Sequence, residues 1–259
     1  MPFYAGIDVG SLSSDAVIID QEGQVVGSAI TETGAHSTQA AERALDLALA
    51  QAELNRGDLA FSVATGYGRV SVPMANKAIT EISCHGLGAH AIFPNTRTVI
   101  DIGGQDSKAI SLDDKGKVVD FVMNDKCAAG TGRFLEVMAA KLGLTLDDLG
   151  RLSLAASGEV SISSVCTVFA ESEVVSLVAR NHPPEQIVKG LHRAIVNRVA
   201  AMVGGLGVKE AVTMSGGVAK NAGVVTLMAE RLGVKIQVPP EPQIVGALGA
   251  ALLARRQAG

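Results

Sequence analysis

Short apolar runs separated by glycine-containing turns occupy two parts of the chain. The runs are rich in Val, Ile and Ala, and each ends at a turn that contains Gly, Ser or Asp. Apolar runs bounded in this way are typical of β-strands. They predict one group of three strands near the N-terminus and another near the middle of the chain, at 4–9, 15–20 and 24–30 and at 97–102, 106–112 and 117–123.

The two groups of strands repeat one another. Residues 6–20 recur at 99–113, so the strand-end residue Asp8 corresponds to Asp101. A repeat that keeps its register beyond a single motif indicates a duplicated domain. We therefore expect two similar lobes, each beginning with a strand, a tight turn and two further strands.

Between and after these groups, apolar residues recur with helical spacing. The pattern predicts helices and additional strands, the helices at 37–54, 73–91, 133–142, 168–180, 184–206, 219–232 and after Pro242, the strands at 61–66, 211–215 and 234–238. Pro94 and Asn95 mark the expected boundary, which gives lobes at 1–95 and 96–259, with the last helix as a candidate to pack back on the first lobe. The fold class is α/β, with mixed sheets flanked by helices.

Composition and charge exclude several classes of protein. The chain has 47% hydrophobic residues but no Trp, two Tyr and six Phe, so small aliphatic side chains must fill the core. A net charge of −4 without a Lys/Arg stripe gives no support to nucleic-acid binding. No apolar stretch approaches the roughly 20 residues of a membrane span, and three widely spaced cysteines indicate reduced thiols. These features predict a cytoplasmic protein that binds neither nucleic acid nor membrane.

The first turn of each repeat has the chemistry of a phosphate site. Backbone N–H groups in such turns can bind phosphate oxygens, and a strand-end carboxylate can hold hydrated Mg²⁺ beside them. We assign Asp8 and Asp101 to the cation side and Gln105 to orienting the attacking water. Each aspartate could instead simply end its strand, but the in-register repeat favours one nucleotide between two turns. The turn residues are Gly10, Ser11, Leu12, Ser13, Gly103 and Gly104.

A second glycine turn could accommodate the adenosine. Gly216 and Gly217 follow a predicted strand, and the absence of side chains there would let a flat base approach the backbone. Lys220, Asn221 and Gln243 could line this pocket. Taken alone, the Ser-Gly-Gly sequence is also a common strand-to-helix turn.

Two of the three cysteines precede predicted helices. Cys127 and Cys166 are each expected at a helix N-terminus, where the helix dipole stabilises a thiolate. A four-iron cluster needs four thiolates as a rule, so two chains with two cysteines each would meet that requirement on a two-fold axis. Alternatively, both are small buried hydrophobic residues, which is the usual fate of a free cysteine. Cys84 is expected in the core, and the five histidines show no metal-ligand spacing.

At this level of detail the sequence resembles a known family. The segments that carry the resemblance are GIDVGS, ATGYGR, EISCHG, DIGGQDSK, MNDKCAAGTGRFLEVM, CTVFAESEV, SGGVAKN and GALGAALLA, which begin at residues 6, 64, 81, 101, 123, 166, 215 and 246. They are similar to activators (component A) of 2-hydroxyacyl-CoA dehydratases in the BadF/BadG/BcrA/BcrD ATPase family. This family lies within the actin, Hsp70 and sugar kinase superfamily, so the resemblance implies two RNase H-like domains.

The resemblance also implies a cofactor and partners. It implies a homodimer that holds one 4Fe–4S cluster through Cys127 and Cys166 of each chain, and that binds ATP or ADP with Mg²⁺. ATP hydrolysis would drive a low-potential electron into a partner iron–sulfur dehydratase or reductase, with ferredoxin or flavodoxin as the donor. Lys108, Gly130, Thr131 and Gly132 complete the candidate cofactor-binding residues.

One residue departs from the family pattern. Asp15 stands in the first phosphate hairpin where relatives usually carry Lys, whereas Lys108 is retained in the second. A carboxylate there puts the phosphate contact of the first hairpin in doubt. Other functions also stay open: an activator of a double-cubane cluster protein, an ATP-binding subunit of the benzoyl-CoA reductase type, a small-molecule kinase, and a non-catalytic nucleotide sensor.

Overall fold

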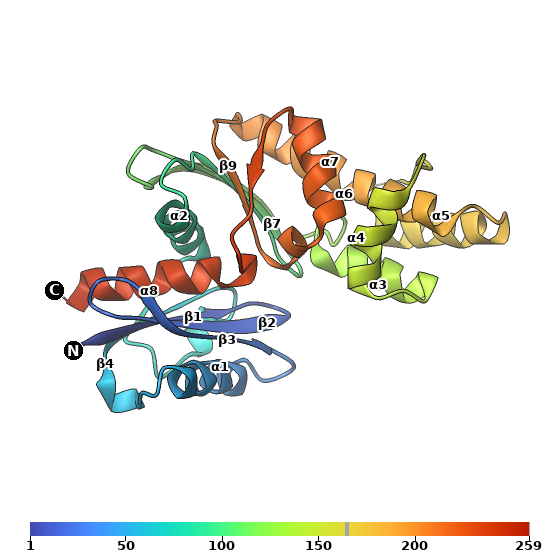
Figure 1. Ribbon diagram of the computed structural model, residues 1–259. Helices are drawn as coiled ribbons and strands as arrows, with labels where there is room; N and C mark the ends of the chain where they lie inside the picture. The colour runs from blue at the N-terminus through green and yellow to red at the C-terminus, as the bar shows by residue number, and fades with distance from the viewer. Residues whose placement is uncertain (164–165, 259) are drawn as a thin grey trace.

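Two five-stranded mixed sheets form the framework of the computed structural model, which describes residues 1–163 and 166–258 (Figure 1). Sheet A has the order β3-β2-β1-β4-β5 and sheet B the order β10-β9-β6-β7-β8. The strands of sheet A are β1 (Phe3–Val9), β2 (Ser13–Ile19), β3 (Val25–Glu32), β4 (Leu59–Thr65) and β5 (Lys77–Ala78). Those of sheet B are β6 (Thr98–Ile102), β7 (Ser107–Leu112), β8 (Val118–Asn124), β9 (Val212–Ser215) and β10 (Ile236–Gln237).

The sequence repeat is a structural repeat. In sheet A the central strand β1 pairs antiparallel with β2 and parallel with β4, and in sheet B the central strand β6 pairs in the same way with β7 and β9. Asp8 lies opposite Asp15 across its hairpin, and Asp101 lies opposite Lys108. Both groups of three strands are therefore confirmed, and the two strand-end aspartates occupy equivalent positions. The exact division at residue 95 stays a prediction.

The helices of the described residues are α1 to α8. Their bounds are α1 (Ser37–Gln51), α2 (Glu81–Ile92), α3 (Gly132–Leu142), α4 (Leu146–Ala155), α5 (Thr167–Ala179), α6 (Pro184–Leu206), α7 (Ala222–Leu232) and α8 (Val245–Ala258). Helix α4 was not predicted, although its first turn has a capping box in which Thr145 and Asp148 satisfy each other's backbone N–H groups. Helices α3, α4 and α5 extend away from both sheets on the side of sheet B (Figure 1).

The helix expected at 73–91 begins later than predicted. Residues 77 and 78 instead pair with β4 as the short strand β5. Asn76 holds this segment extended, because its Oδ1 accepts hydrogen bonds from the backbone N–H (2.8 Å) and the hydroxyl (2.9 Å) of Ser62. Helix α2 consequently starts at Glu81.

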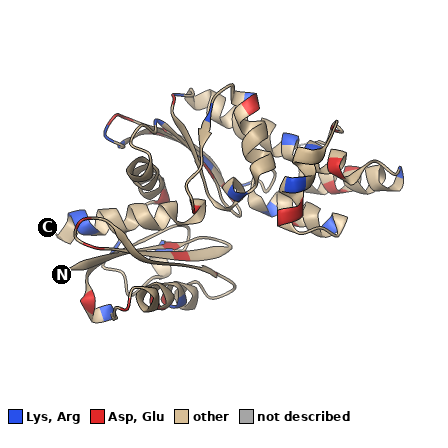
Figure 2. Ribbon diagram, viewed as in Figure 1, with Lys and Arg blue, Asp and Glu red and all other residues tan. Residues whose placement is uncertain are grey.

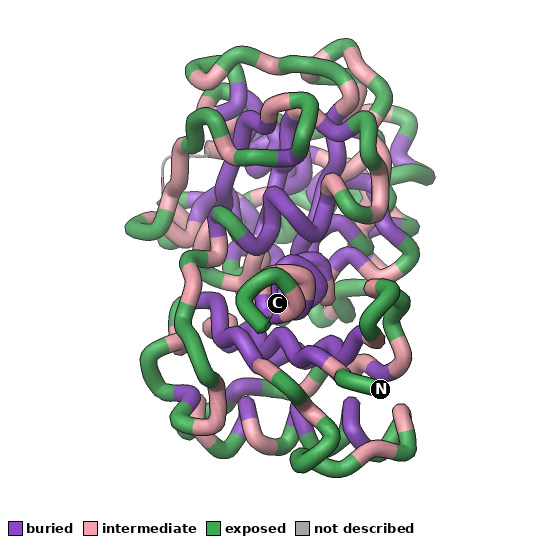
Figure 3. Tube along the Cα trace, turned by 90° about the vertical axis from the view of Figure 1, so that its left-hand side faces the viewer, coloured by how far each residue is buried: buried purple, intermediate pink, exposed green. Residues whose placement is uncertain are grey.

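The last helix packs on the first sheet. Helix α8 contacts β1, β2, β4 and α2, and it lies between the two sheets (Figures 1 and 3). Helix α2, although it precedes β6 in the chain, contacts β6, β7, β8 and β9 of sheet B. The two helices thus form the interface between the lobes, with α8 facing sheet A and α2 facing sheet B.

Glycines allow α2 and α8 to approach backbone to backbone. A Cβ at Gly249 would overlap the carbonyl oxygen of Cys84, and one at Gly88 would overlap the carbonyl oxygen of Val245. Cys84 is fully buried at this contact, as expected, and burial raises the pKa of its thiol to about 12. The segment GALGAALLA is therefore rich in small residues because the interface between the lobes has no room for larger ones.

Gly249→Ala is expected to lower the free energy of unfolding by about 2–3 kcal/mol, because the added methyl group forces α2 and α8 apart. Gly205→Ala is the matched control, since that helical glycine has no neighbouring atom within 4 Å of an added Cβ. It should leave stability unchanged or raise it by up to about 1 kcal/mol. Urea unfolding monitored by circular dichroism measures both, and equal stabilities for the two variants would contradict the close-packing argument.

Acidic and basic positions are scattered over both lobes (Figure 2).

The largest hydrophobic core cluster belongs to sheet B and its helices, and smaller clusters join sheet A to α1 and to α8. No helix among the described residues is long and apolar enough to cross a lipid bilayer.

Candidate functional site

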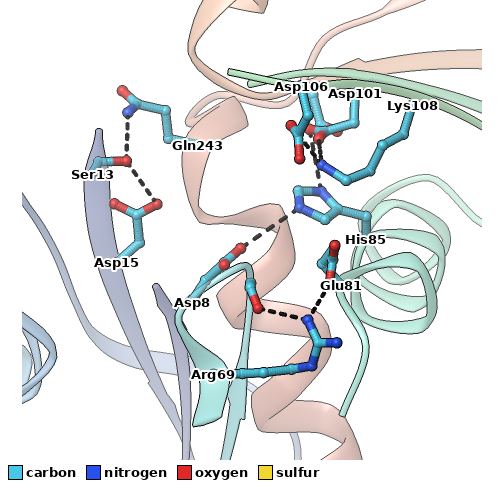
Figure 4. Close-up of polar contacts among 12 residues, drawn as sticks. Asp8, Ser13, Asp15, Arg69, Glu81, His85, Asp101, Asp106, Lys108 and Gln243 are labelled. Carbon is cyan, nitrogen blue, oxygen red and sulfur yellow. Dashed lines mark hydrogen bonds and ion pairs between the residues drawn. The ribbon is translucent and has the colours of Figure 1, made fainter. Parts of the chain in front are cut away.

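The strand-end aspartates of the two sheets converge on a single side chain. His85 of α2 lies with Nε2 3.6 Å from Asp8 Oδ2 and with Nδ1 3.3 Å from Asp101 Oδ1 (Figure 4). All three residues are buried. The duplicated sheets thus place both predicted cation-side carboxylates at the interface between the lobes, one on either side of an imidazole.

Asp101 belongs to a polar network of sheet B. Lys108 Nζ lies 3.3 Å from Asp101 Oδ2 and 2.8 Å from Asp106 Oδ1, while the Ser215 hydroxyl donates to Asp101 Oδ1 at 2.9 Å. Burial by itself would lower the pKa of Lys108, but Asp101 and Asp106 raise it above the usual value. Lys108 therefore carries a permanent positive charge next to the second phosphate turn.

The two aspartates differ in their electrostatics. Burial raises the pKa of Asp8, and the opposing influence of His85 and Lys108 does not compensate. Burial would also raise the pKa of Asp101, but His85, Lys108 and the Ser215 hydroxyl outweigh it, so this pKa lies below its usual range. Asp101 is thus held as a carboxylate, whereas Asp8 needs a cation nearby to favour its ionised form.

The two phosphate turns face each other. The Leu12 side chain of the first turn lies so close to Gly104 of the second that a Cβ on Gly104 would overlap it. Each turn is closed by a backbone hydrogen bond, from Gly10 N to Ser13 O (2.9 Å) and from Gly103 N to Asp106 O (3.0 Å). Gln105 lies exposed at the tip of the second turn. The predicted turn residues are therefore gathered at one place.

The segment before α3 adjoins the second turn. Gly132 N donates to Gly103 O, and Arg133 N donates to Gly104 O, each at 2.8 Å. Gly130 has a positive φ of 100°, and the Thr131 hydroxyl donates to Ala128 O at 2.7 Å. The N-terminus of α3 is consequently attached to the second phosphate turn.

The candidate adenosine residues separate into two sets. Gly216, with a φ of 83°, lies against the carbonyl oxygen of Ile102 and near Asp101, and Gln243 donates to the Ser13 hydroxyl of the first turn at 3.4 Å. Gly217 lies close to the Gln243 side chain. These residues border the two turns.

Lys220 and Asn221 are engaged within the protein. Lys220 forms an ion pair with Glu241 at 2.9 Å. Asn221 caps α7 by accepting from Val224 N at 3.1 Å, and its amide nitrogen lies 3.2 Å from His192 Nε2. Burial lowers the pKa of His192 to about 4, so this pair joins neutral groups. These contacts favour a structural role for Asn221, and its assignment to nucleotide stays a prediction.

Asp15 lies in the first hairpin as a buried acid. Its Oδ2 accepts from the Ser13 hydroxyl at 3.2 Å, while its buried Oδ1 has no hydrogen-bond partner within residues 1–163 and 166–258. Burial, aided by the neighbouring Asp8, raises the pKa of Asp15 to about 8. The equivalent position in the second hairpin is Lys108, so the two phosphate turns carry different chemistry at this point.

Asp15→Asn is expected to abolish one component of the pH dependence of stability. The unfolded chain loses the Asp15 proton near its ordinary pKa, about 4, whereas the folded chain keeps it up to about pH 8. Stability therefore falls as pH rises between these values and stays low above them. At pH 8.5 the Asn variant should be more stable than the parent by up to about 5 kcal/mol, because each unit between the two pKa values corresponds to about 1.4 kcal/mol.

Urea unfolding at pH 5, 7 and 8.5 measures this effect. Asp114→Asn, a change at an exposed position in the β7–β8 turn, is the control and should follow the parent at each pH. A parent-like pH dependence in Asp15→Asn would show that Asp15 is already ionised in the folded protein.

The two candidate metal-ligating cysteines precede α3 and α5, which together with α4 form a helical extension on the side of sheet B. Cys166 is the N-cap residue of α5, as predicted. Cys127 is not at a helix terminus: it lies in the loop after β8, five positions before α3 begins at Gly132. Helix α3 begins one residue before its predicted start, and residues 128–131, which separate Cys127 from it, form a turn in which Thr131 N donates to Ala128 O at 3.0 Å. Both thiols are free and partly exposed.

Sequence reasoning missed His85, Ser215 and Asp106. All three lie in segments that carry the family resemblance, and Glu81 and His85 are also four residues apart, which places them on one helical face. On that face Glu81 forms an ion pair with Arg69 at 2.8 Å. Arg69 also donates to the carbonyl oxygen of Gly66 at 2.9 Å, and Gly66 lies directly against Asp8. The segments ATGYGR and EISCHG thus meet beside Asp8.

Comparisons with known proteins agree with this geometry. Residues 5–254 match the BadF/BadG/BcrA/BcrD ATPase family. The chain is 49% identical over 252 residues to the activator of lactoyl-CoA dehydratase from Anaerotignum propionicum, covering 97% of each protein. Among solved structures, it matches the activator of the 2-hydroxyisocaproyl-CoA dehydratase from Clostridium difficile with bound ADPNP (46% identity, TM-score 0.95, 99% and 95% covered). It also matches component A of the Acidaminococcus fermentans (R)-2-hydroxyglutaryl-CoA dehydratase, with 44% identity and a TM-score of 0.96. That match covers 100% of this chain and 99% of the other.

More distant comparisons concern the fold. A ROK family glucokinase from Streptomyces griseus, in complex with glucose and AMPPNP, has a TM-score of 0.59 at 14% identity and covers 98% of this chain. At that identity the likeness extends to the fold alone. It agrees with the predicted fold class, α/β with two mixed sheets flanked by helices.

Proposed function

The chain belongs to the BadF/BadG/BcrA/BcrD ATPase family, and we propose that it is an ATP-hydrolysing activator that transfers a low-potential electron to a partner iron–sulfur enzyme, such as a 2-hydroxyacyl-CoA dehydratase. One combination of features carries this proposal. Two facing turns, each beside a buried strand-end aspartate, meet at the interface between the lobes. The second turn is hydrogen-bonded to Gly132 and Arg133, which follow Cys127 in the chain.

The nucleotide would lie between the two turns. Asp8 and Asp101 would hold its Mg²⁺ through bound water, and Lys108 would face the phosphates from the second turn. Bound Mg²⁺ would neutralise charge that develops on the phosphate oxygens. Within the described residues, no group of three or more His, Cys, Asp or Glu side chains is arranged to bind a metal. Two carboxylates suit Mg²⁺, which keeps several waters and takes its other ligands from phosphate.

The chemistry of the two thiols suits an iron–sulfur cluster. Cys127 and Cys166 are free, partly exposed, and carried by neighbouring parts of one helical extension, in which α3 packs against α5. A 4Fe–4S cluster bound there would supply one-electron chemistry at low potential. Because this chain offers two thiolates for a group that needs four, a second copy must supply the others.

A homodimer is also supported by the surface next to Cys166. Helix α5 exposes four large apolar side chains: Val168, Phe169, Val175 and Val178. Exposed apolar residues gathered on one helix are typical of an interaction surface. We propose that α5 of one copy meets the same region of the other around the cluster.

The structure offers a physical link between hydrolysis and the cysteines. Because Gly132 N and Arg133 N donate to the carbonyl oxygens of Gly103 and Gly104, any shift of the second turn displaces the start of α3. Cys127 lies in the loop immediately before that point. Loss of the terminal phosphate would change the contacts of the second turn and thereby reposition this loop.

The test is an ATP-dependent electron-transfer assay. The protein, purified without oxygen, should be brown and dimeric, and with reduced ferredoxin or flavodoxin it should activate a 2-hydroxyacyl-CoA dehydratase only when ATP is added. Omission of ATP or its replacement by a non-hydrolysable analogue is the control. Colourless protein with full ATPase activity would contradict the proposal. Phosphorylation of a small molecule in place of water would support a kinase instead.

A further inference from the structure

His85 connects the two lobes at their cation-side carboxylates. Its imidazole has one nitrogen facing Asp8 of sheet A, at 3.6 Å, and the other facing Asp101 of sheet B, at 3.3 Å. The residue is 6% exposed, and its Nδ1 makes no well-aligned hydrogen bond with any described residue. Its polar neighbours at the two nitrogens are thus the carboxylates of Asp8 and Asp101.

The fold keeps space for this contact. A Cβ on Gly246 of α8 would overlap Asp8 Oδ2 and would lie 2.9 Å from His85 Nε2. A glycine on α8 is therefore required where the imidazole and the carboxylate meet. On α2, the neighbouring Glu81 pairs with Arg69, which anchors the same helical face to the loop beneath Asp8.

We propose that His85 is a positioning residue for ATP hydrolysis, which holds the Asp8 and Asp101 carboxylates at a fixed separation on opposite sides of one nucleotide. Asp8 and Asp101 belong to different sheets, so backbone hydrogen bonding within a sheet cannot fix their relative position. His85 on α2, which lies at the interface between the lobes, can fix it by interacting with both carboxylates. This inference rests on the nucleotide chemistry proposed above.

A purely space-filling role does not account for the geometry. Inert filling of a buried gap would use an apolar side chain, since a buried polar group is costly unless it has partners. Both ring nitrogens instead face carboxylates of known position. The ring is thus placed where its polar atoms interact with both lobes at once.

The test compares three substitutions of His85 that differ in which aspartate the new side chain can still contact. His85→Asn keeps a polar group near the Nδ1 position and His85→Gln near the Nε2 position, so each retains a link to one aspartate, whereas His85→Ala retains none. We expect kcat for ATP hydrolysis to fall about 100-fold in His85→Ala and by less in the two amides, because misplacement of reacting groups by about 1 Å costs that much. The KM for ATP should change by less than about threefold, because a residue that positions the reacting groups affects kcat, whereas a residue that only binds ATP affects KM.

His90→Ala is the matched control, because His90 lies on the same helix and packs on Gly116, away from Asp8 and Asp101. It should keep the parent kcat. In an Asp101→Asn background, His85→Ala should have no further effect on kcat, since the link is already broken. Circular dichroism and urea unfolding confirm that each variant is folded.

Three results would overturn the inference: parent kcat in all three His85 variants, equal losses in His85→Ala and His90→Ala, or additive losses in the double variant. If the parent chain itself fails to hydrolyse ATP, the proposed function fails. If the parent hydrolyses ATP and the His85 variants match it, only the role of His85 fails.

Discussion

Cys127→Ser and Cys166→Ser are each expected to abolish iron binding while ATP hydrolysis stays within about twofold of the parent. Thiolate, not thiol or hydroxyl, is the metal-ligating form. In a symmetric dimer one substitution removes two of the four ligands, so neither variant should retain a partial cluster. Neither thiol lies among the residues that form the nucleotide site, and both are partly exposed, so folding should be preserved.

Iron and sulfide analysis, the visible spectrum and an ATPase assay measure these effects together. Cys84→Ala is the control, because that cysteine is fully buried between α2 and α8 and distant in sequence from the helical extension. It should keep the iron and lose on the order of 1 kcal/mol of stability. Retention of full iron in either serine variant would remove that cysteine from the ligand set and with it the cluster proposed here.

Asp101→Asn is expected to lower ATP hydrolysis by at least about 100-fold and to destabilise the fold by about 3 kcal/mol. The loss of activity follows from removing one cation-side carboxylate. The loss of stability follows because Lys108 is buried and charged, and it would keep only Asp106 as a partner. The pKa of Asp101 lies below its usual value, so its contribution to stability is present at neutral pH and is lost as pH falls through that pKa.

Asp8→Asn is the matched comparison. It should lose hydrolysis to a similar extent, because the cation loses its other carboxylate. It should cost less stability than Asp101→Asn, since burial raises the pKa of Asp8 and a neutral amide avoids that cost. Urea unfolding at pH 7 and a phosphate-release assay separate the two effects. Equal destabilisation by both substitutions would contradict the asymmetry, and parent activity in either would exclude that aspartate from the site.

The local sequence was sufficient to predict the two groups of three strands and the tight turn in each. Alternation of apolar runs with glycine turns depends on residues close together in the chain, and the repeat of Asp8 as Asp101 made each assignment support the other. The N-cap position of Cys166 was predicted for the same reason. Cys127 was wrongly assigned to a helix N-terminus, because the turn at residues 128–131, in which Gly130 has a positive φ, separates it from the start of α3 at Gly132.

Contacts between distant segments could not be predicted. The start of α2 was wrong because Asn76 pairs with Ser62, a contact that no local pattern reveals. His85 has no metal-ligand spacing and was set aside, yet α2 carries it between two aspartates from different sheets. Only the packing of α2 against α8 shows that this histidine lies in the site.

The sequence by itself determined the two repeated hairpins, their aspartates and the presence of Cys127 and Cys166 as candidate ligands, because these depend on residue type and short-range spacing. The tertiary structure alone decided that the hairpins face each other and that His85 lies between Asp8 and Asp101. It also decided that the pKa of Asp101 is lowered whereas that of Asp8 is raised. Those properties depend on burial and on distances between elements, which arise only when α2 and α8 pack at the interface between the two sheets.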